Sequence, residues 1–223
     1  MSTIGIIGSG NIGATVARLA IQAGHDVVLS NSRSPQTLWP LAAALGPKAR
    51  TATPEEAGQA GELILVSVPL HRYRDVPAEP LTGKLVLDTG NYYPDRDGRI
   101  AELDSGQATT SSLLQVHLAD AQVVKVFNNI WFHHLGILAR TSDSPERSTL
   151  PVAGDDSDAK ASAQALVDQL GYDTYDAGTL ADSWRFERDQ PAYVTPYGPF
   201  DVAAAATPVS TEGLARVLAQ ATR

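Results

Sequence analysis

Residues 3–33 read TIGIIGSGNIGATVARLAIQAGHDVVLSNSR, and this stretch decides the fold. A short apolar run, Thr3–Ile7, leads into a glycine-rich turn and then into apolar residues at helical spacing up to about Ala23. Gly24 ends the expected helix, and Asp26–Ser30 follows as a second buried strand. Strand, turn, helix and strand in this order predict a βαβ unit that binds the phosphates of a dinucleotide.

The three glycines of the turn have separate expected roles. Gly8 permits the tight turn, Gly10 lets the backbone approach a pyrophosphate, and Gly13 lets the helix pack closely on the strand. The helix that follows offers free N–H groups and the positive end of its dipole to the phosphates. A glycine-rich turn without a ligand is the alternative, but the position between a strand and a helix favours the dinucleotide.

The residues after the second strand indicate which dinucleotide is bound. An NAD site usually places Asp or Glu there, because a carboxylate accepts hydrogen bonds from the ribose 2′-hydroxyl. This chain has Asn31, Ser32 and Arg33 instead. The first two can donate hydrogen bonds to a 2′-phosphate, and the guanidinium of Arg33 can form a charged fork. The sequence therefore predicts NADP(H) rather than NAD, the alternative being that Arg33 is only a solvated loop cation.

The rest of the chain continues to alternate strands and helices. The expected strands are Ala49–Ala52, Glu62–Val68, Lys84–Asp88, Gln122–Phe127, Thr149–Ala153 and Asp173–Asp176. The expected helices begin near Ser34 and Thr53, span Ser111–Leu118, Trp131–Arg140 and Asp158–Leu170, and resume at about Pro208, whereas Pro94–Asp104 reads as a surface loop.

This alternation predicts an α/β fold with a Rossmann-type, doubly wound, mainly parallel sheet. We expect an NADP-binding domain over residues 1–148. A small C-terminal extension over residues 149–223 would add strands and helices and form the wall on the side of the hydride acceptor.

Three further loops lie at the carboxyl ends of expected strands, where ligands of such sheets bind. They contain Val68-Pro69, Thr89-Gly90-Asn91 and Asn128-Asn129. Pro69 has no N–H and could border the nicotinamide ribose, while Asn91 and Asn129 could hydrogen-bond the ribose, the carboxamide or the second substrate. The tandem asparagines could equally serve only the turn.

The composition narrows the class of protein. A net charge of −8 without a block of lysine or arginine argues against nucleic acid and anionic membranes as partners. The absence of cysteine removes disulfides, thiolate metal sites and thiol catalysis. No signal peptide and no long apolar run is visible, so we expect a soluble, cytoplasmic protein.

No metal site and no catalytic acid or base is expected. His133 and His134 are adjacent, and on a helix their side chains point about 100° apart, which prevents easy sharing of a metal ion.

Several motifs together resemble one family. They are GIIGSGNIG (5–13), NSR (31–33), SVP (67–69), LDTGN (87–91), KVFNN (125–129), GDDSDAK (154–160) and LGYDTYDAGTL (170–180). With them the chain resembles the NADPH-dependent coenzyme F420 reductases (F420:NADP oxidoreductases) from Ile4 to roughly Tyr197. It is also similar to the cytosolic reductase domain of the six-transmembrane metalloreductases. KVFNN followed by the DAG of residues 176–178 is the more specific part, because many Rossmann proteins share the first motif.

The resemblance implies hydride transfer from NADPH to a flavin-type ring, a deazaflavin in the F420 enzymes and FAD in the metalloreductases. The implied contacts are Ser9, Asn11 and Ile12 with the pyrophosphate, Asn31, Ser32 and Arg33 with the 2′-phosphate, Val68 and Pro69 with the ribose and nicotinamide, and Asn129 with the acceptor ring. Residues 128–132 depart from the pattern of the F420 reductases, which leaves the acceptor open.

We expect an NADP-dependent oxidoreductase that transfers hydride between NADP(H) and a small flavin-like acceptor such as coenzyme F420. Stacked rings need closeness and alignment more than a protein acid or base. An NADPH-binding redox sensor without turnover, or a reductase of another small carbonyl or imine substrate, are the alternatives.

The aromatic residues of the C-terminal part are expected either to cover the acceptor or to pack in the core or a dimer interface. They are Trp184, Phe186, Tyr193 and Tyr197. A homodimer is expected, because the alanine-rich Val202–Ala206 and the terminal helix offer packing surface.

Overall fold

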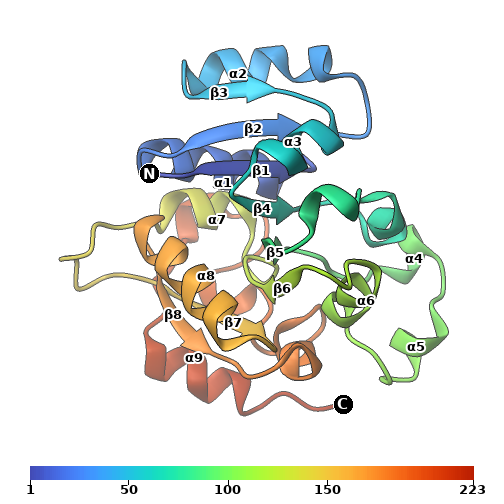
Figure 1. The fold of residues 1–223 in the computed structure, drawn as a ribbon. Coiled ribbons are helices and arrows are strands. Elements are labelled where there is room, and N and C mark those ends of the chain that lie inside the picture. The colour runs from blue at the N-terminus through green and yellow to red at the C-terminus, as the bar shows by residue number, and fades with distance from the viewer.

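An eight-stranded sheet runs through the molecule in the order β3-β2-β1-β4-β5-β6-β7-β8 (Figure 1). The structure is a computed structural model that describes residues 1–223. The strands are β1 (Thr3–Ile7), β2 (Asp26–Ser30), β3 (Ala49–Thr51), β4 (Leu63–Val66), β5 (Leu85–Asp88), β6 (Gln122–Lys125), β7 (Thr149–Gly154) and β8 (Asp173–Asp176). All neighbouring strands are parallel except β6 and β7, which are antiparallel. The predicted Rossmann-type α/β fold is confirmed.

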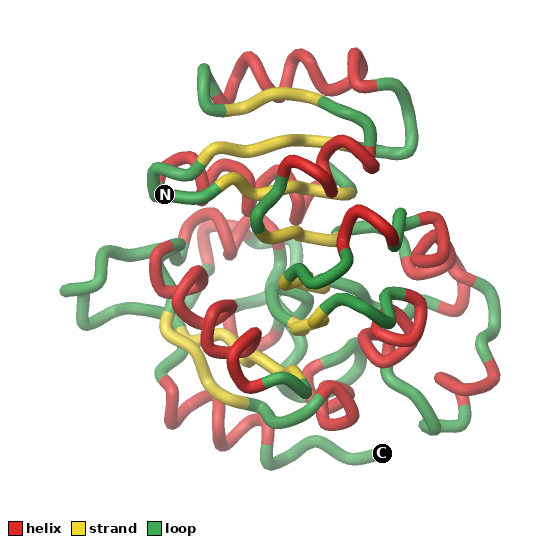
Figure 2. Tube along the Cα trace, viewed as in Figure 1, coloured by secondary structure: helices red, strands yellow, loops and turns green.

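α-Helices lie between most of the strands, and one follows the last strand, as Figure 2 shows by colour. They are α1 (Asn11–Gln22), α2 (Trp39–Leu45), α3 (Pro54–Ala60), α4 (Pro94–Asp97), α5 (Ala101–Asp104), α6 (Thr110–His117), α7 (Phe132–Ile137), α8 (Ser157–Gln169) and α9 (Thr211–Leu218). Several begin where the sequence provides a cap. Thr53 forms a capping box with Glu56, and the Asp156 side chain accepts from the N–H of Ala159 at the start of α8.

The two faces of the sheet bury separate apolar clusters, because successive side chains of a strand point to opposite faces. Ile6 and Leu65 belong to the larger cluster, which also holds residues of α1, α7 and α8. Ile7 and Ile64, one position away in each strand, belong to the smaller cluster with residues of α6. Parallel strands buried on both sides account for the continuous apolar runs of the sequence.

The boundary between residues 148 and 149 divides the chain but does not divide the sheet. β7 pairs with β6 through Val124–Gly154 and Lys125–Ala153, and β8 pairs with β7. Residues on both sides of the boundary share the larger apolar cluster. Arg147, just before the boundary, forms ion pairs of 2.7 Å with Asp168 and 2.8 Å with Asp173. The C-terminal part therefore shares a core with the first part.

Residues 94–104 differ from the surface loop expected from their polar composition, since they contain the short helices α4 and α5. Long-range contacts hold these turns. The fully buried Asp97 carboxylate accepts hydrogen bonds from Arg96 and from the Tyr93 N–H, and lies 2.9 Å from Nδ1 of His71. Tyr92 donates to Asp104. Composition alone does not reveal such pairings.

Several expected elements are shorter in the structure. β4 spans Leu63–Val66 rather than Glu62–Val68, β3 lacks the expected Ala52, and β5 lacks the expected Lys84. β6 ends at Lys125 rather than Phe127, because Phe127 has φ of 65°, which is incompatible with a strand. The helix expected over Trp131–Arg140 is α7, Phe132–Ile137. No helix combines the length and the apolar character that crossing a membrane requires.

Candidate functional site

The glycine-rich turn joins β1 to α1 through a tight backbone loop. Gly8 has φ of 102°, a left-handed conformation that favours glycine. The N–H groups of Gly8 and Ser9 both donate to the Ser30 carbonyl, at 3.0 and 3.1 Å. The Ser9 hydroxyl donates to the same oxygen at 3.0 Å. The turn is thereby attached to the end of β2, where the expected 2′-phosphate residues begin.

Gly10 and Gly13 are glycines for different reasons. A Cβ on Gly13 would lie 2.1 Å from the Gly8 carbonyl oxygen, so the close packing of helix and turn requires glycine there. A Cβ on Gly10 would meet no protein atom within 4 Å, and the φ of Gly10 is −78°, which suits any residue. The protein's own packing therefore does not require glycine at position 10, whereas the close approach of a dinucleotide would.

The N-terminus of α1 faces the same space with unused donors. The N–H groups of Asn11, Ile12 and Gly13 donate to no protein acceptor, and no side chain caps the helix. The first turn of α1 contains no acidic residue. Free N–H groups and the positive end of the helix dipole make this a suitable seat for a pyrophosphate.

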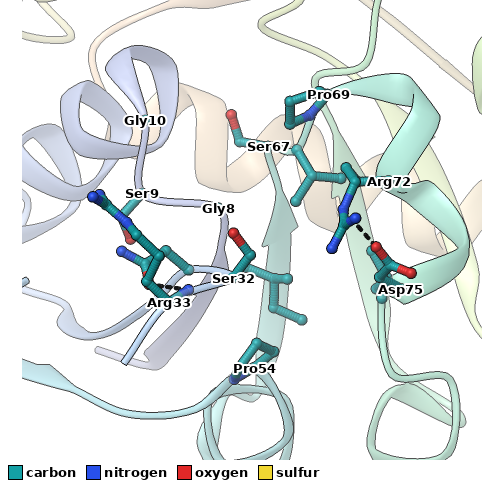
Figure 3. Close-up of a pocket in the computed structure, with 14 residues that line it drawn as sticks. Gly8, Ser9, Gly10, Ser32, Arg33, Pro54, Ser67, Pro69, Arg72 and Asp75 are labelled. Atoms are coloured by element: carbon teal, nitrogen blue, oxygen red, sulfur yellow. Dashed lines mark hydrogen bonds and ion pairs between the residues drawn. The ribbon is translucent and has the colours of Figure 1, made fainter. Parts of the chain in front are cut away.

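A cavity of about 430 Å³ lies between this turn, the end of β2 and the end of β4 (Figure 3). Its walls hold the predicted residues Gly8, Ser9, Gly10, Asn31, Ser32, Arg33, Val68 and Pro69. The structure thus brings both halves of the predicted dinucleotide site, the phosphate turn and the residues after β2, to one cavity.

Within this cavity Asn31 and Arg33 have different positions. The Asn31 side chain accepts from the Arg33 N–H at 2.9 Å and donates to Thr37 at 3.0 Å, so it organises the loop after β2. The guanidinium of Arg33 forms no hydrogen bond or ion pair within the protein. Arg33 is therefore a cation free to bind an anionic ligand.

Arg72 lines the opposite side of the cavity and was not predicted (Figure 3). It belongs to the 3₁₀ helix Leu70–Asp75, which begins directly after Pro69, and forms an exposed ion pair with Asp75 at 2.6 Å. Its planar guanidinium could stack on an adenine ring lying between the two arginines. The signal in the sequence is an arginine three residues beyond the SVP motif.

A second cavity of about 380 Å³ adjoins the first, and Gly10, Ser67, Val68 and Pro69 line both. Asn11, Ile12 and Asn91, all predicted from the sequence, also line it. The remaining wall is largely aromatic and apolar and includes Tyr93, Ile130, Trp131, Phe132, Tyr193, Val194 and Phe200. The two cavities form one groove along the carboxyl ends of the central strands.

Asn91 and Asn128 both line the second cavity, and two hydrogen bonds join them. Asn91 donates to the Asn128 carbonyl at 2.7 Å, and Asn128 donates to Asn91 Oδ1 at 3.1 Å. Below them the fully buried Lys125 binds the Gly90 carbonyl at 2.9 Å and Glu187 at 3.1 Å. The Lys125–Glu187 pair joins β6 to the C-terminal part and fixes the loop that carries Asn91.

Asn129 lies away from both cavities, contrary to the position near an acceptor ring that the resemblance implied. Its fully buried amide donates to the Ala192 carbonyl and to the Tyr197 hydroxyl, at 3.0 and 3.2 Å. Its own carbonyl accepts from the Val194 N–H at 2.8 Å. The neighbouring Asn128 lines the second cavity instead. A side chain's direction after a strand end depends on the loop, and Phe127 in the left-handed region redirects this one.

Of the four aromatic residues weighed as an acceptor cover, only Tyr193 lines the second cavity. Phe186 and Tyr197 are fully buried in the larger apolar cluster, and Trp184 lies under the guanidinium of Arg223. Next to Tyr193, Val194 has φ of 58°, which is strained for a β-branched residue.

Comparison with known proteins relates the part of the chain that forms most of this groove to one family of oxidoreductases. Residues 3–92 match the family described as NADP oxidoreductase, coenzyme F420-dependent. This range contains β1 to β5 and every predicted cofactor residue except Asn129. The comparison with curated proteins gave no match.

Three solved structures illustrate the structural likeness. A hypothetical protein from Sinorhizobium meliloti has 25% identity and a TM-score of 0.75, with 86% of this chain and 93% of that chain covered. A protein from Arthrobacter sp., provisionally named an F420-dependent NADP reductase, has 20% identity and a TM-score of 0.64, with 82% and 87% covered. An imine reductase from Pseudomonas sp. has 19% identity and a TM-score of 0.55, with 87% and 58% covered.

The expected family resemblance is confirmed over residues 3–92, and the expected enzyme class, an NAD(P)-dependent oxidoreductase, is confirmed with it. The chain spans little more than half of the imine reductase, which is the longer protein.

Proposed function

We propose, on the premise that residues 3–92 match the coenzyme F420-dependent NADP oxidoreductases, that this protein transfers hydride between NADP(H) and a flavin-like acceptor such as coenzyme F420. The observation that carries the proposal is the pair of adjoining cavities that share Gly10, Ser67, Val68 and Pro69. A dinucleotide laid across these shared residues has its adenosine end in the first cavity and its nicotinamide end in the second.

The first cavity supports NADP(H) as the nucleotide. The free guanidinium of Arg33 and the hydroxyl of Ser32 lie beyond β2, where the 2′-phosphate of a dinucleotide on such a sheet is bound. No carboxylate stands at this position to repel it. Asp75, the acidic residue of the cavity, lies across it and is paired with Arg72.

The second cavity supports a planar acceptor. Its apolar and aromatic wall can receive a ring face to face with the nicotinamide, and Val68 and Pro69 limit the cavity on the side of β4. Hydride transfer between two stacked rings requires closeness and orientation above all. The bound nucleotide supplies the hydride, and the protein aligns the two rings and restricts water.

An acceptor screen tests the proposal. NADPH oxidation is followed by loss of nicotinamide absorbance with F420, FMN and FAD in turn, and each reaction is repeated with NADH. We expect turnover with at least one of these rings and a lower rate with NADH. Tight NADPH binding without turnover by any acceptor would contradict the proposal and favour a redox sensor.

A second candidate function is the reduction of a small carbonyl or imine by NADPH. The observation that favours it is a pair of tyrosine hydroxyls, Tyr93 and Tyr193, in the wall of the second cavity. Such reductions require a proton as well as a hydride. Turnover of cyclic imines or aldehydes, in the absence of turnover with F420, FMN and FAD, would select this candidate.

A further inference from the structure

Tyr93 and Tyr193 are joined by a direct hydrogen bond between their hydroxyl oxygens, although they lie 100 residues apart in the chain. Tyr93 follows β5 by a few residues, and Tyr193 belongs to the C-terminal part. Both are partly buried and both line the second cavity. The pair therefore brings two phenol hydroxyls to the cavity wall, beside the amides of Asn11, Asn91 and Asn128.

One of the two hydroxyl hydrogens of the pair has no acceptor in the protein. Two hydroxyl groups carry two hydrogens, and the bond between the oxygens uses one. Neither oxygen bonds any other protein group. The second hydrogen can therefore be donated to a molecule bound in the cavity without breaking an existing contact.

Two cations lie next to the pair. The guanidinium carbons of Arg96 and Arg188 are 4.6 and 5.2 Å from the centre of the Tyr93 ring. Arg96 is held there by two hydrogen bonds of 2.8 Å to the buried carboxylate of Asp97. Arg188 is paired with Asp189 at 3.4 Å, so each guanidinium shares its charge with a carboxylate. The two arginines therefore pack on the Tyr93 ring through cation–π contacts and favour a transient phenolate only in part.

Burial, followed by the hydrogen bond with Tyr93, raises the pKa of the Tyr193 hydroxyl above its ordinary value. The Tyr193 hydroxyl is therefore neutral at physiological pH and keeps its proton until an anion forms beside it.

The segment that carries Tyr193 is held firmly. Its neighbours Ala192 and Val194 are both bound by Asn129, through a carbonyl contact of 3.0 Å and an N–H contact of 2.8 Å. Tyr197 donates to the Thr149 carbonyl at 2.9 Å, which attaches the same segment to β7. Asn129 is thus a positioning residue for Tyr193.

We propose that the Tyr93–Tyr193 pair is the proton donor of the reaction, a role that rests on the proposed function. NADPH transfers a hydride, with its electron pair, to the electron-poor atom of a C=N or C=O bond of the acceptor, and becomes NADP⁺. The displaced π electrons pass to the nitrogen or oxygen, which takes a proton from the pair. The resulting phenolate recovers a proton from solvent, so that one NADPH and one proton reduce one acceptor by two electrons.

Tyr93→Phe, Tyr193→Phe and the double variant test this role, since each change removes only oxygen atoms. Tyr73→Phe is the matched control, because the Tyr73 hydroxyl bonds the exposed Arg74 and does not line either cavity. The measurements are kcat with the best acceptor of the screen, NADPH affinity by fluorescence, and thermal unfolding.

We expect kcat of the double variant to fall on the order of 10²- to 10⁴-fold, the range for loss of a general acid. NADPH affinity and unfolding should stay within about twofold and a few degrees of the wild type, as should all properties of the control. Added small buffer acids should restore part of the rate of the double variant in proportion to their concentration. A purely structural role would not produce that rescue.

Three results would overturn the proposal. Wild-type kcat in the double variant would show that the proton comes from elsewhere, and would leave the proposed function intact. An equal loss of NADPH affinity and of kcat, without buffer rescue, would assign the pair a structural role. Absence of NADPH oxidation by the wild type with every acceptor would overturn the proposed function and the proton donor together.

Discussion

At the scale of single residues, Gly10 and Gly13 differ in why a glycine is expected. At Gly13 the packing of the protein itself excludes a side chain, whereas at Gly10 only a bound ligand would exclude one. The space beside Gly10 contains no protein atom, while the space beside Gly13 is occupied by the Gly8 carbonyl. Replacement by alanine should therefore weaken ligand binding at position 10 and lower the stability of the fold at position 13.

Gly10→Ala should change the free energy of unfolding by no more than about 0.5 kcal/mol, as for an unstrained surface position. It should weaken NADPH binding at least about tenfold, because the added methyl group occupies the ligand's space. Gly13→Ala should destabilise the fold by about 1–3 kcal/mol through overpacking. Urea unfolding measures the stability of each variant, and NADPH fluorescence titration measures its affinity. Unchanged affinity in Gly10→Ala would contradict the placement of the pyrophosphate.

Arg33→Asp should weaken NADPH much more than NADH. Loss of a charge-assisted hydrogen bond costs about 1.5–3 kcal/mol, and the new carboxylate adds repulsion. The affinity for NADPH should fall on the order of 10²-fold, and that for NADH by less than about threefold. Arg50→Asp, an exposed change in β3 outside both cavities, is the control. Equal loss of both nucleotides would contradict the assignment of Arg33 to the 2′-phosphate.

At the scale of elements, Asp97 ties the short helix α4 to the 3₁₀ helix Leu70–Asp75. Burial on its own would raise the pKa of Asp97, but hydrogen bonds from Arg96, from His71 and from the Tyr93 N–H outweigh it and lower the pKa to about 2. The ordinary value is 3.8. The ionised carboxylate is therefore favoured in the folded state, and it holds Arg96 beside the second cavity.

The lowered pKa of Asp97 makes a prediction about acid stability. A carboxylate with a depressed folded pKa stabilises the fold above the unfolded value and loses that contribution as pH falls through the folded value. The stability difference between the wild type and Asp97→Asn should be about 2 kcal/mol at neutral pH, and should disappear between pH 3.8 and about pH 2.

Urea unfolding over a pH series measures this difference. Asp95→Asn is the matched control, because Asp95 is exposed and neighbours the same turn. A difference that stays constant down to pH 2 would show that the Asp97 contacts do not depend on its charge.

At the scale of the whole molecule, the C-terminal part is built into the sheet of the first part. Removing residues 149–223 would expose the edge of β6, leave Lys125 without Glu187, and delete Leu150, Val152 and Leu166 from the larger apolar cluster. A buried cation that loses its partner costs about 3–5 kcal/mol, which is comparable with the whole stability of a small domain.

A fragment of residues 1–148 should therefore fail to fold, and the full chain should unfold in a single cooperative transition. Circular dichroism and urea unfolding measure both. Removal of the exposed residues 222–223 is the control. It deletes only the contact of Arg223 with Trp184 and the Thr222–Gln190 hydrogen bonds, and should leave the transition in place. A folded, NADPH-binding fragment would show that residues 1–148 form an independent domain.

The expected homodimer stays a prediction. Sedimentation analysis of the full chain measures the oligomeric state.

The amino-acid sequence by itself determined the βαβ unit, the order of strands and helices apart from α4 and α5, and the cavity in which we propose that the nucleotide binds. Apolar periodicity and glycine spacing are local properties, and parallel strands bring their carboxyl ends to one edge whatever else the chain does. For the same reason the residues Gly8, Ser9, Gly10, Asn31, Ser32, Arg33, Val68 and Pro69 could be assigned to one site before the fold was known.

Only the tertiary structure decided the walls of the second cavity, where we propose that the acceptor binds. It joined Tyr93 to Tyr193 across 100 residues, placed Arg72 opposite Arg33, and turned Asn128 toward the cavity while Asn129 bound the C-terminal segment. These positions depend on left-handed backbone at Phe127 and Val194 and on contacts between distant loops. Neither has a periodic signal, because a loop takes its conformation from what it packs against.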